Sequence, residues 1–255
     1  MTSIFDSDEL NQRLFFPRRD RSRPPERAVE LEVPGAVMRH VRCHRWLDEA
    51  PTLLLFHGNG EVTGDYDASA RHFARCGVNL AVMDYRGYGR SEGTPTFRNM
   101  IEDAHRVFEA VNPQFIMGRS LGSACMAELY ATSFARGFVF ESGFVDLEAL
   151  VERRGLKAMG LRDRGTFDPL PKLARGTAPL LVLHGEDDTI ISADEGRRAY
   201  AAAGTTDKQL VLVPDHGHND LSHGASYWKL PRGVHREVVV KQTLREQRTP
   251  PSIRG

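Results

Sequence analysis

Two serines in this chain lie in the five-residue pattern G-x-S-x-G. One is Ser91, in GRSEG at residues 89–93, and the other is Ser120, in GRSLG at residues 118–122. This pattern can present a serine as a nucleophile on a sharp turn between a strand and a helix. A serine hydroxyl is a weak nucleophile at neutral pH, so it needs a base beside it and an acid that orients the base.

Ser120 has the flanks that such a turn requires. The apolar run FIM at 115–117 predicts a strand that leads directly into the serine, and the segment 121–134 predicts a helix that leaves it. Because the serine takes a strained backbone angle, the residues two positions away must be small, and they are Gly118 and Gly122. We therefore predict that Ser120 is the nucleophile.

Ser91 lacks these flanks. It follows a glycine-rich loop at 85–89, several residues beyond its strand, and it precedes the sequence GTP at 93–95, which cannot begin a regular helix at once. We interpret its match to the pattern as a coincidence in a loop.

The acid and the base are expected after the serine, in that order along the chain. Two polar loops follow in that order, HGEDD at 184–188 and DHGHND at 215–220. From residue chemistry alone the three carboxylates of the first loop are equivalent candidates for the acid: Glu186, Asp187 and Asp188. The second loop offers His216 and His218 as the base.

The remaining histidines at strand ends are weaker candidates for the base. His57 and His184 each precede a glycine at the end of a predicted strand, where a histidine more often braces a loop than transfers a proton. His216 and His218 also match the spacing of a metal pair, but no third ligand lies at a suitable spacing, so we expect no metal and no cofactor.

The elements that must position these residues are short strands alternating with helices. Six continuous apolar runs are typical of strands covered on both faces, and they lie at 53–56, 80–83, 115–117, 138–140, 180–183 and 210–213. Segments between them predict helices at 66–76, 96–111, 121–134 and 193–203, the last opened by a capping box of Ser192 and Glu195. One or two antiparallel edge strands are expected within 27–46. The pattern predicts an α/β fold with a mostly parallel sheet between helices.

A polar or glycine-bearing loop follows each predicted strand. In a parallel sheet the carboxyl ends of the strands meet at one edge, where ligands bind. The loops HGNG, DYRGYG, GRSLG, ESGF, HGEDD and PDHGHND all fall at this edge. The candidate serine, acid and base are therefore expected to lie close together.

The chain resembles the α/β-hydrolase superfamily, and within it the compact serine hydrolases that include the Bem46-like proteins and their bacterial relatives. The motifs that carry this resemblance are FHGNG (56–60), DYRGYGRSEG (84–93), GRSLG (118–122), HGEDD (184–188) and GHND (217–220), in the order found in that family. The resemblance implies a twisted, mostly parallel sheet with helices on both faces and a short cap.

The resemblance also selects among the candidates. The pattern H-G-x-x-D implies Asp188 as the acid, with Asp187 as the alternative, and G-H-N-D implies His218 as the base, with His216 as its rival. An oxyanion needs two backbone donors. The amide of Leu121, directly after the serine at a helix start, is one, and the resemblance implies the amide of Asn59 as the other.

We expect three segments along the chain. Residues 1–26 form a flexible N-terminal arm, 27–240 the hydrolase domain, and 241–255 a basic flexible tail. A short, charged cap is expected at about 145–178. Its apolar residues are more typical of packing on the core than of binding an acyl chain: Leu147, Leu150, Val151, Leu156, Met159 and Leu161.

The composition sets the broad class. The 34 basic and 34 acidic residues give a formal net charge of zero, which favours neither nucleic acid nor an anionic membrane as a partner. No apolar run reaches the ~20 residues of a membrane helix. The N-terminus lacks the pattern of a secretory signal, and Cys43, Cys76 and Cys125 are too few and too scattered for a disulfide framework. We expect a cytoplasmic protein, and the sequence does not indicate its oligomeric state.

These patterns predict a serine hydrolase that cleaves a carboxylic ester or thioester through an acyl-serine intermediate. Its partner is then a small-molecule or acyl substrate. Two alternatives stay open: a non-catalytic binding or scaffold protein on the same fold, and an amide or C–C bond hydrolase that uses the same three residues.

Overall fold

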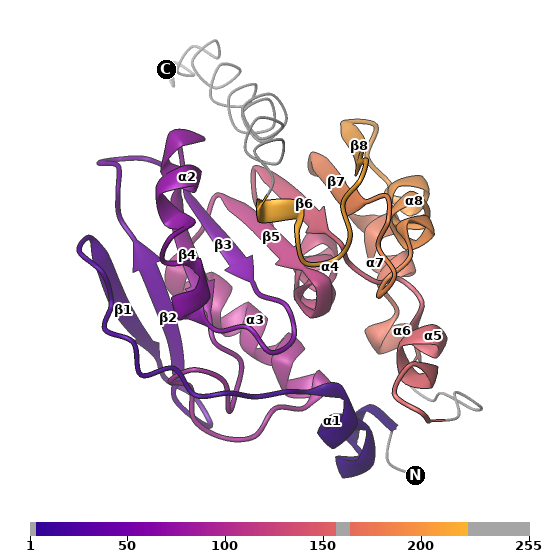
Figure 1. Ribbon diagram of the computed structural model, residues 1–255, viewed down its shortest axis with the longest axis horizontal. Coiled ribbons are helices and arrows are strands. Elements are labelled where there is room, and N and C mark those ends of the chain that lie inside the picture. Colours follow the sequence, from indigo (N-terminus) through magenta and orange to yellow (C-terminus); the bar gives the residue numbers. More distant parts are fainter. Residues whose placement is uncertain (1–3, 157–163, 224–255) are drawn as a thin grey trace, which may run out of the picture.

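The computed structural model describes residues 4–156 and 164–223, and these build an eight-stranded sheet in the order β1-β2-β4-β3-β5-β6-β7-β8 (Figure 1). Strands β3 to β8 are parallel, whereas β2 is antiparallel to both β1 and β4. The strands are β1 Ala28–Val33, β2 Arg39–His44, β3 Thr52–Phe56, β4 Asn79–Met83, β5 Phe115–Arg119, β6 Gly137–Glu141, β7 Leu180–Gly185 and β8 Lys208–Val213. Each of the six predicted apolar runs lies in one of these strands.

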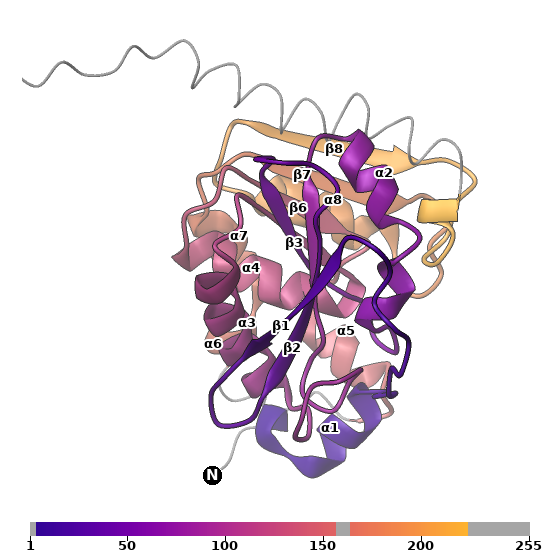
Figure 2. The same ribbon diagram turned by 90° about the vertical axis from the view of Figure 1, so that its left-hand side faces the viewer.

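Helices cover both faces of the sheet. They are α1 Asp8–Leu14, α2 Ala70–Arg75, α3 Phe97–Val111, α4 Ser123–Thr132, α5 Leu147–Glu152, α6 Arg164–Phe167, α7 Pro169–Arg175 and α8 Ala193–Ala202. Figure 2 shows the sheet edge-on, with α3 and α4 on one face and α2 on the other. No helix in the described part of the chain is long and apolar enough to span a bilayer.

Alternation along the strands divides the apolar side chains between two cores. In β3, Leu54 and Phe56 belong to the larger cluster with α3 and α4, while Leu53 and Leu55 belong to the smaller cluster with α2. This follows from the two-residue period of a strand, which sends successive side chains to opposite faces. A strand buried on both faces has no polar position, which explains the continuous apolar runs.

The N-terminal segment differs from the flexible arm that we expected over residues 1–26. Ser7 caps α1, and the side chains of Phe5, Leu10 and Leu14 are fully buried against the main core. The side chain of Asn11 accepts a hydrogen bond from the amide of Phe97, which ties α1 to the start of α3. Apolar residues at this spacing give the short helix a buried face, and burial outweighs the cost of ordering it.

Two local predictions are corrected by long-range contacts. Within 27–46, β1 is an edge strand but β2 is an interior strand, paired on both sides. Ser192 caps α8 by accepting from the amide of Asp194, but Glu195 does not complete a capping box. Its carboxylate instead accepts from the amides of Val145 and Asp146, at 2.8 and 3.1 Å, and so anchors the chain just before α5.

The segment predicted as a cap contains α5, α6 and α7. Of its apolar residues, Leu147, Leu150 and Val151 are buried in the main core, as expected for packing rather than for a large lid. Met159 and Leu161 lie outside the described residues, as does the predicted basic tail at 241–255.

Candidate active site

Ser120 lies on a strained turn between β5 and α4. Its φ is +50°, a left-handed value that a non-glycine residue rarely takes. The turn is too tight for side chains on either side: a Cβ on Gly118 would lie 2.5 Å from the carbonyl oxygen of Gly122, and one on Gly122 would lie 2.0 Å from that of Phe56. The two glycines of GRSLG are therefore required by close backbone approach.

Three side chains from three loops form one hydrogen-bonded chain at the carboxyl edge of the sheet. Ser120 Oγ lies 2.8 Å from His218 Nε2, and His218 Nδ1 lies 2.7 Å from Asp188 Oδ2. These residues follow β5, β8 and β7, and each is less than one tenth exposed. Serine, imidazole and carboxylate in this order can pass a proton from the hydroxyl to the ring while the carboxylate holds the ring.

Asp188 is held as a carboxylate by its neighbours. Burial alone would raise its pKa, but hydrogen bonds from His184, His218 and the amide of Ile191 outweigh burial and hold the pKa well below its usual value. The His184 ring contributes through Nε2, which lies 3.2 Å from Asp188 Oδ2 and 2.8 Å from the carbonyl oxygen of Ile191. An ionised Asp188 is the form that stabilises a positive imidazolium.

The alternative residues lie elsewhere. Asp187 is exposed and its amide donates to the carbonyl of His216, whereas the carboxylate that meets His218 is that of Asp188. The His216 ring lies 2.8 Å from the carbonyl oxygen of Pro214. Ser91 is fully buried in its loop, where its hydroxyl donates to the carbonyl of Asp84 at 2.7 Å and accepts from the amide of His40 at 2.8 Å.

His57 has a bracing contact of the kind that we expected. Its side chain is fully buried, with Nδ1 2.8 Å from the carbonyl oxygen of Gly58 and Nε2 3.9 Å from Asp84. Burial outweighs Asp84 and lowers the pKa of this histidine.

A small cavity of about 70 Å³ opens onto Ser120. Asn59 and Leu121, whose amides are the predicted oxyanion donors, line the same cavity. Most of its other wall is apolar, and two arginines of the cap complete it: Leu14, Phe144, Leu150, Ile190, Ile191, Arg153 and Arg154.

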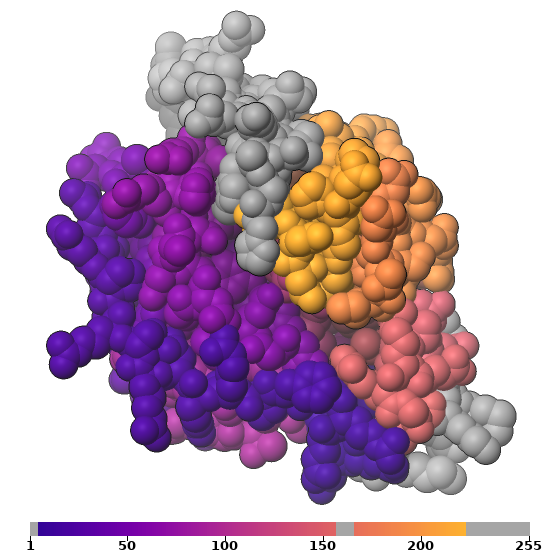
Figure 3. All heavy atoms as spheres, in the orientation of Figure 1, coloured from indigo at the N-terminus to yellow at the C-terminus, as the bar shows by residue number. Residues whose placement is uncertain are grey.

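One part of this wall was missed by the sequence analysis, namely α1. Leu14 reaches the cavity from the N-terminal segment, and the Asn59 side chain fixes that segment by donating to the Leu14 carbonyl and accepting from the amide of Phe16. Arg13 also donates to the carbonyls of Arg154 and Gly155, and Figure 3 shows the N-terminal segment (indigo) beside the cap (pink) on this face. The signal that was available is the i, i+4 spacing of Leu10 and Leu14, which follow the capping residue Ser7.

A mostly parallel sheet with a strained serine after β5, a carboxylate after β7 and a histidine after β8 defines an α/β hydrolase. Solved structures show the same fold. An esterase from Pyrococcus furiosus matches with a TM-score of 0.70 at 15% identity, over 88% of this chain and 98% of that chain. Paleococcus ferrophilus monoacylglycerol lipase matches with a TM-score of 0.63 at 18% identity, over 81% of this chain and 99% of that chain.

Within this superfamily the chain belongs to the Hydrolase_4 family, described as serine aminopeptidase, S33, whose model matches residues 48–164 and 164–222. The lysophosphatidylserine lipase ABHD12 of Gallus gallus is 27% identical, over 84% of this chain and 64% of that protein. The alpha/beta hydrolase domain-containing protein aho-3 of Caenorhabditis elegans is 30% identical, over 69% of this chain and 54% of that protein. The chain spans less than two thirds of the length of these relatives.

Proposed function

We propose that this protein is a serine hydrolase that cleaves a carboxylic ester or thioester through an acyl-serine intermediate. The observation that carries the proposal is the chain of two short hydrogen bonds from Ser120 through His218 to Asp188, at the wall of a cavity large enough to admit an ester carbonyl. Membership of a hydrolase family and the lipases and esterases among its relatives support the same reaction class.

The proposed reaction has two halves. Ser120 Oγ attacks the carbonyl carbon while His218 Nε2 takes its proton, and the amides of Leu121 and Asn59 stabilise the oxyanion. The intermediate collapses when His218 returns the proton to the leaving alcohol or thiol, which leaves an acyl-serine. Water then attacks the acyl-serine ester with His218 as the base. The carboxylic acid product is released, and the Ser120 hydroxyl is regenerated when His218 returns the proton to it.

We further propose that the ester carries an anionic group. Arg154 lines the cavity. Among residues 4–156 and 164–223 no carboxylate pairs with its guanidinium, and its Nε is buried without a hydrogen-bond partner. Burial and the neighbouring Arg153 lower the pKa of Arg154. A phosphate or carboxylate on the substrate would satisfy these donors, and the ABHD12 relatives are named for a substrate of this charge.

The reaction class is tested by labelling the purified protein with a fluorophosphonate and locating the adduct by mass spectrometry. We expect an adduct on Ser120 that is absent in Ser120→Ala. Ser91→Ala is the matched control, because Ser91 shares the G-x-S-x-G pattern but not the histidine, and it should label like the unmodified protein. A folded protein that neither labels nor hydrolyses esters would favour the binding-protein alternative, and an adduct on Ser91 would contradict the assignment.

The substrate charge is tested with two esters of the same acyl chain, 1-acylglycerol and 1-acylglycerol 3-phosphate. We expect Arg154→Gln to lower kcat/KM for the phosphate ester by about 10-fold or more, because a charge-assisted hydrogen bond is lost, and to leave the neutral ester unchanged. Equal effects on both esters would refute the anionic preference while leaving ester hydrolysis intact. Amides included in the same panel would reveal the amide-hydrolase alternative.

A further inference from the structure

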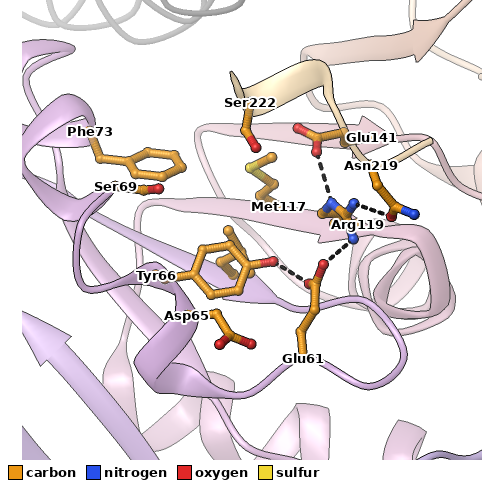
Figure 4. Close-up of a pocket in the computed structure, with 11 residues that line it drawn as sticks. Glu61, Asp65, Tyr66, Ser69, Phe73, Met117, Arg119, Glu141, Asn219 and Ser222 are labelled. Atoms are coloured by element: carbon orange, nitrogen blue, oxygen red, sulfur yellow. Dashed lines mark hydrogen bonds and ion pairs between the residues drawn. The ribbon is translucent and has the colours of Figure 1, made fainter. Parts of the chain in front are cut away.

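The residue before the serine, Arg119, has its side chain in a second cavity, of about 360 Å³, which shares no lining residue with the cavity at Ser120. Figure 4 shows the Arg119 guanidinium at the centre of a polar cluster in this cavity. Its side chain is 12% exposed, so its charge is largely removed from water. A buried cation of this kind is held only by well-placed acceptors.

Those acceptors come from two other loops of the carboxyl edge and from the end of β6. Arg119 Nη2 donates to the backbone carbonyl of His218 at 3.0 Å and to the side-chain oxygen of Asn219 at 3.1 Å. Its Nε lies 3.3 Å from Glu141, at the end of β6, and its Nη1 pairs with Glu61, in the loop after β3. One planar group thus joins the serine turn to the histidine loop, to β6 and to the loop after β3.

Glu61 extends the connection to the proposed oxyanion site. Its Oε2 accepts from the amide of Gly58 at 2.7 Å and from the Tyr66 hydroxyl at 2.6 Å. Gly58 directly precedes Asn59, whose amide is the proposed second oxyanion donor. Burial would raise the pKa of Glu61, but the charge of Arg119 and the Tyr66 hydroxyl outweigh burial and lower it.

We propose that Arg119 is a positioning residue: it fixes the His218 backbone relative to Ser120 and, through Glu61, fixes the backbone that carries the oxyanion donor. The proposal rests on the proposed function. Only a guanidinium suits this role, since its planar fork of five donors reaches acceptors in three directions at once. A lysine has one ammonium on a flexible stem and cannot hold both Glu61 and the His218 carbonyl in the same way.

The alternative is that Arg119 only stabilises the fold. The two roles differ in what they change, because a misplaced base slows the chemical step in every folded molecule. A displacement of about 1 Å lowers a rate by on the order of 10²-fold. A purely structural arginine would instead lower the melting temperature and leave kcat per folded molecule unchanged.

The test compares Arg119→Lys with Arg86→Lys. Arg86 is a matched control, because it is 16% exposed, forms a two-bond pair with Asp103 and has no contact with the serine, histidine or acid. With kcat normalised to fluorophosphonate-reactive sites, we expect Arg119→Lys to lower kcat by about 10- to 100-fold with KM nearly unchanged. We expect Arg86→Lys to lower only the melting temperature.

Chemical rescue of kcat gives a second measurement, which would not respond if Arg119 had only a structural role. The cavity beside Arg119 gives small cations access to the site that Arg119→Ala vacates, so added guanidinium at low millimolar concentration should restore part of kcat, and ammonium should not. Unchanged kcat in Arg119→Lys, or no rescue of folded Arg119→Ala, would overturn the proposed role of Arg119 and leave the proposed function standing. An unmodified protein that neither labels nor hydrolyses esters would overturn the proposed function as well.

Discussion

At the scale of single residues, Asn59 shows how one side chain can serve a site without taking part in its chemistry. Its amide is the proposed oxyanion donor, whereas its side chain donates to the Leu14 carbonyl and accepts from the amide of Phe16 and from the Tyr88 hydroxyl. The two roles are separable by mutation, because a substitution keeps the backbone amide and removes only the side-chain bonds.

Asn59→Ala is therefore expected to lower kcat far less than Ser120→Ala. The substitution leaves the Leu14 carbonyl without the Asn59 donor, which costs about 1–3 kcal/mol for a buried group, whereas the Phe16 amide keeps its bond to the Tyr88 hydroxyl. We expect faster proteolytic cleavage around residues 13–18, measured by limited proteolysis, together with a modest loss of kcat. A kcat as low as that of Ser120→Ala would show that the side chain itself is needed for the reaction.

At the scale of elements, α1 shows how one short helix can shape the cavity at Ser120. It is seven residues long, too short to be stable alone, and it is held by its buried face. Through Leu14 this helix forms part of the wall around Ser120. The size of the cavity at Ser120 is thus set partly by an element that lies outside the span of the family match, which begins at residue 48.

Leu14→Ala should widen this pocket. Leu10→Ala is the matched control, because both leucines are fully buried in α1 but only Leu14 lines the cavity. Each substitution is expected to lower the free energy of unfolding by about 2–5 kcal/mol, measured by urea denaturation. Only Leu14→Ala should shift the preference toward longer acyl chains, measured as kcat/KM for a series of 4-nitrophenyl esters. The same shift in both variants would mean that α1 acts through stability alone.

At the scale of the whole molecule, buried histidines couple stability to pH. His44, at the end of β2, is 1% exposed, and burial, followed by the charge of Arg42, lowers its pKa from the usual 6.5 to about 4. Asp67 Oδ1 lies 3.4 Å from its Nε2. The unfolded chain binds a proton at His44 near pH 6.5, whereas the folded chain binds it only near pH 4. His44 therefore stabilises the folded state above pH 6.5, and this stabilisation is lost as the pH falls toward 4.

The free energy of unfolding should consequently fall by about 2 kcal/mol between pH 7 and pH 5 through His44 alone. His57 acts in the same direction, so the comparison must be made with His44→Gln, which cannot titrate. We expect this variant to lose about 2 kcal/mol less than the unmodified protein over that interval, measured by denaturation at both pH values. Parallel pH profiles for the two proteins would contradict the low pKa.

The sequence by itself determined the features that depend on neighbouring residues. Continuous apolar runs identified six parallel strands, because a strand buried on both faces needs apolar residues at every position. Gly118 and Gly122 marked the turn at Ser120, since the backbone strain and the need for small neighbours both arise within five residues. The order of the polar loops placed the serine, the carboxylates and the histidines at one edge of the sheet.

Only the tertiary structure decided what depends on residues far apart in the chain. Local chemistry does not distinguish Asp187 from Asp188, and the choice follows from which carboxylate the β7 and β8 loops bring to His218, 30 positions away. The contact of Arg119 with the His218 carbonyl spans 99 positions, and the bond from Arg13 in α1 to the Arg154 carbonyl spans 141. Such contacts leave no periodicity in the sequence, because they are selected by the shape of the folded core rather than by the backbone geometry of any one element.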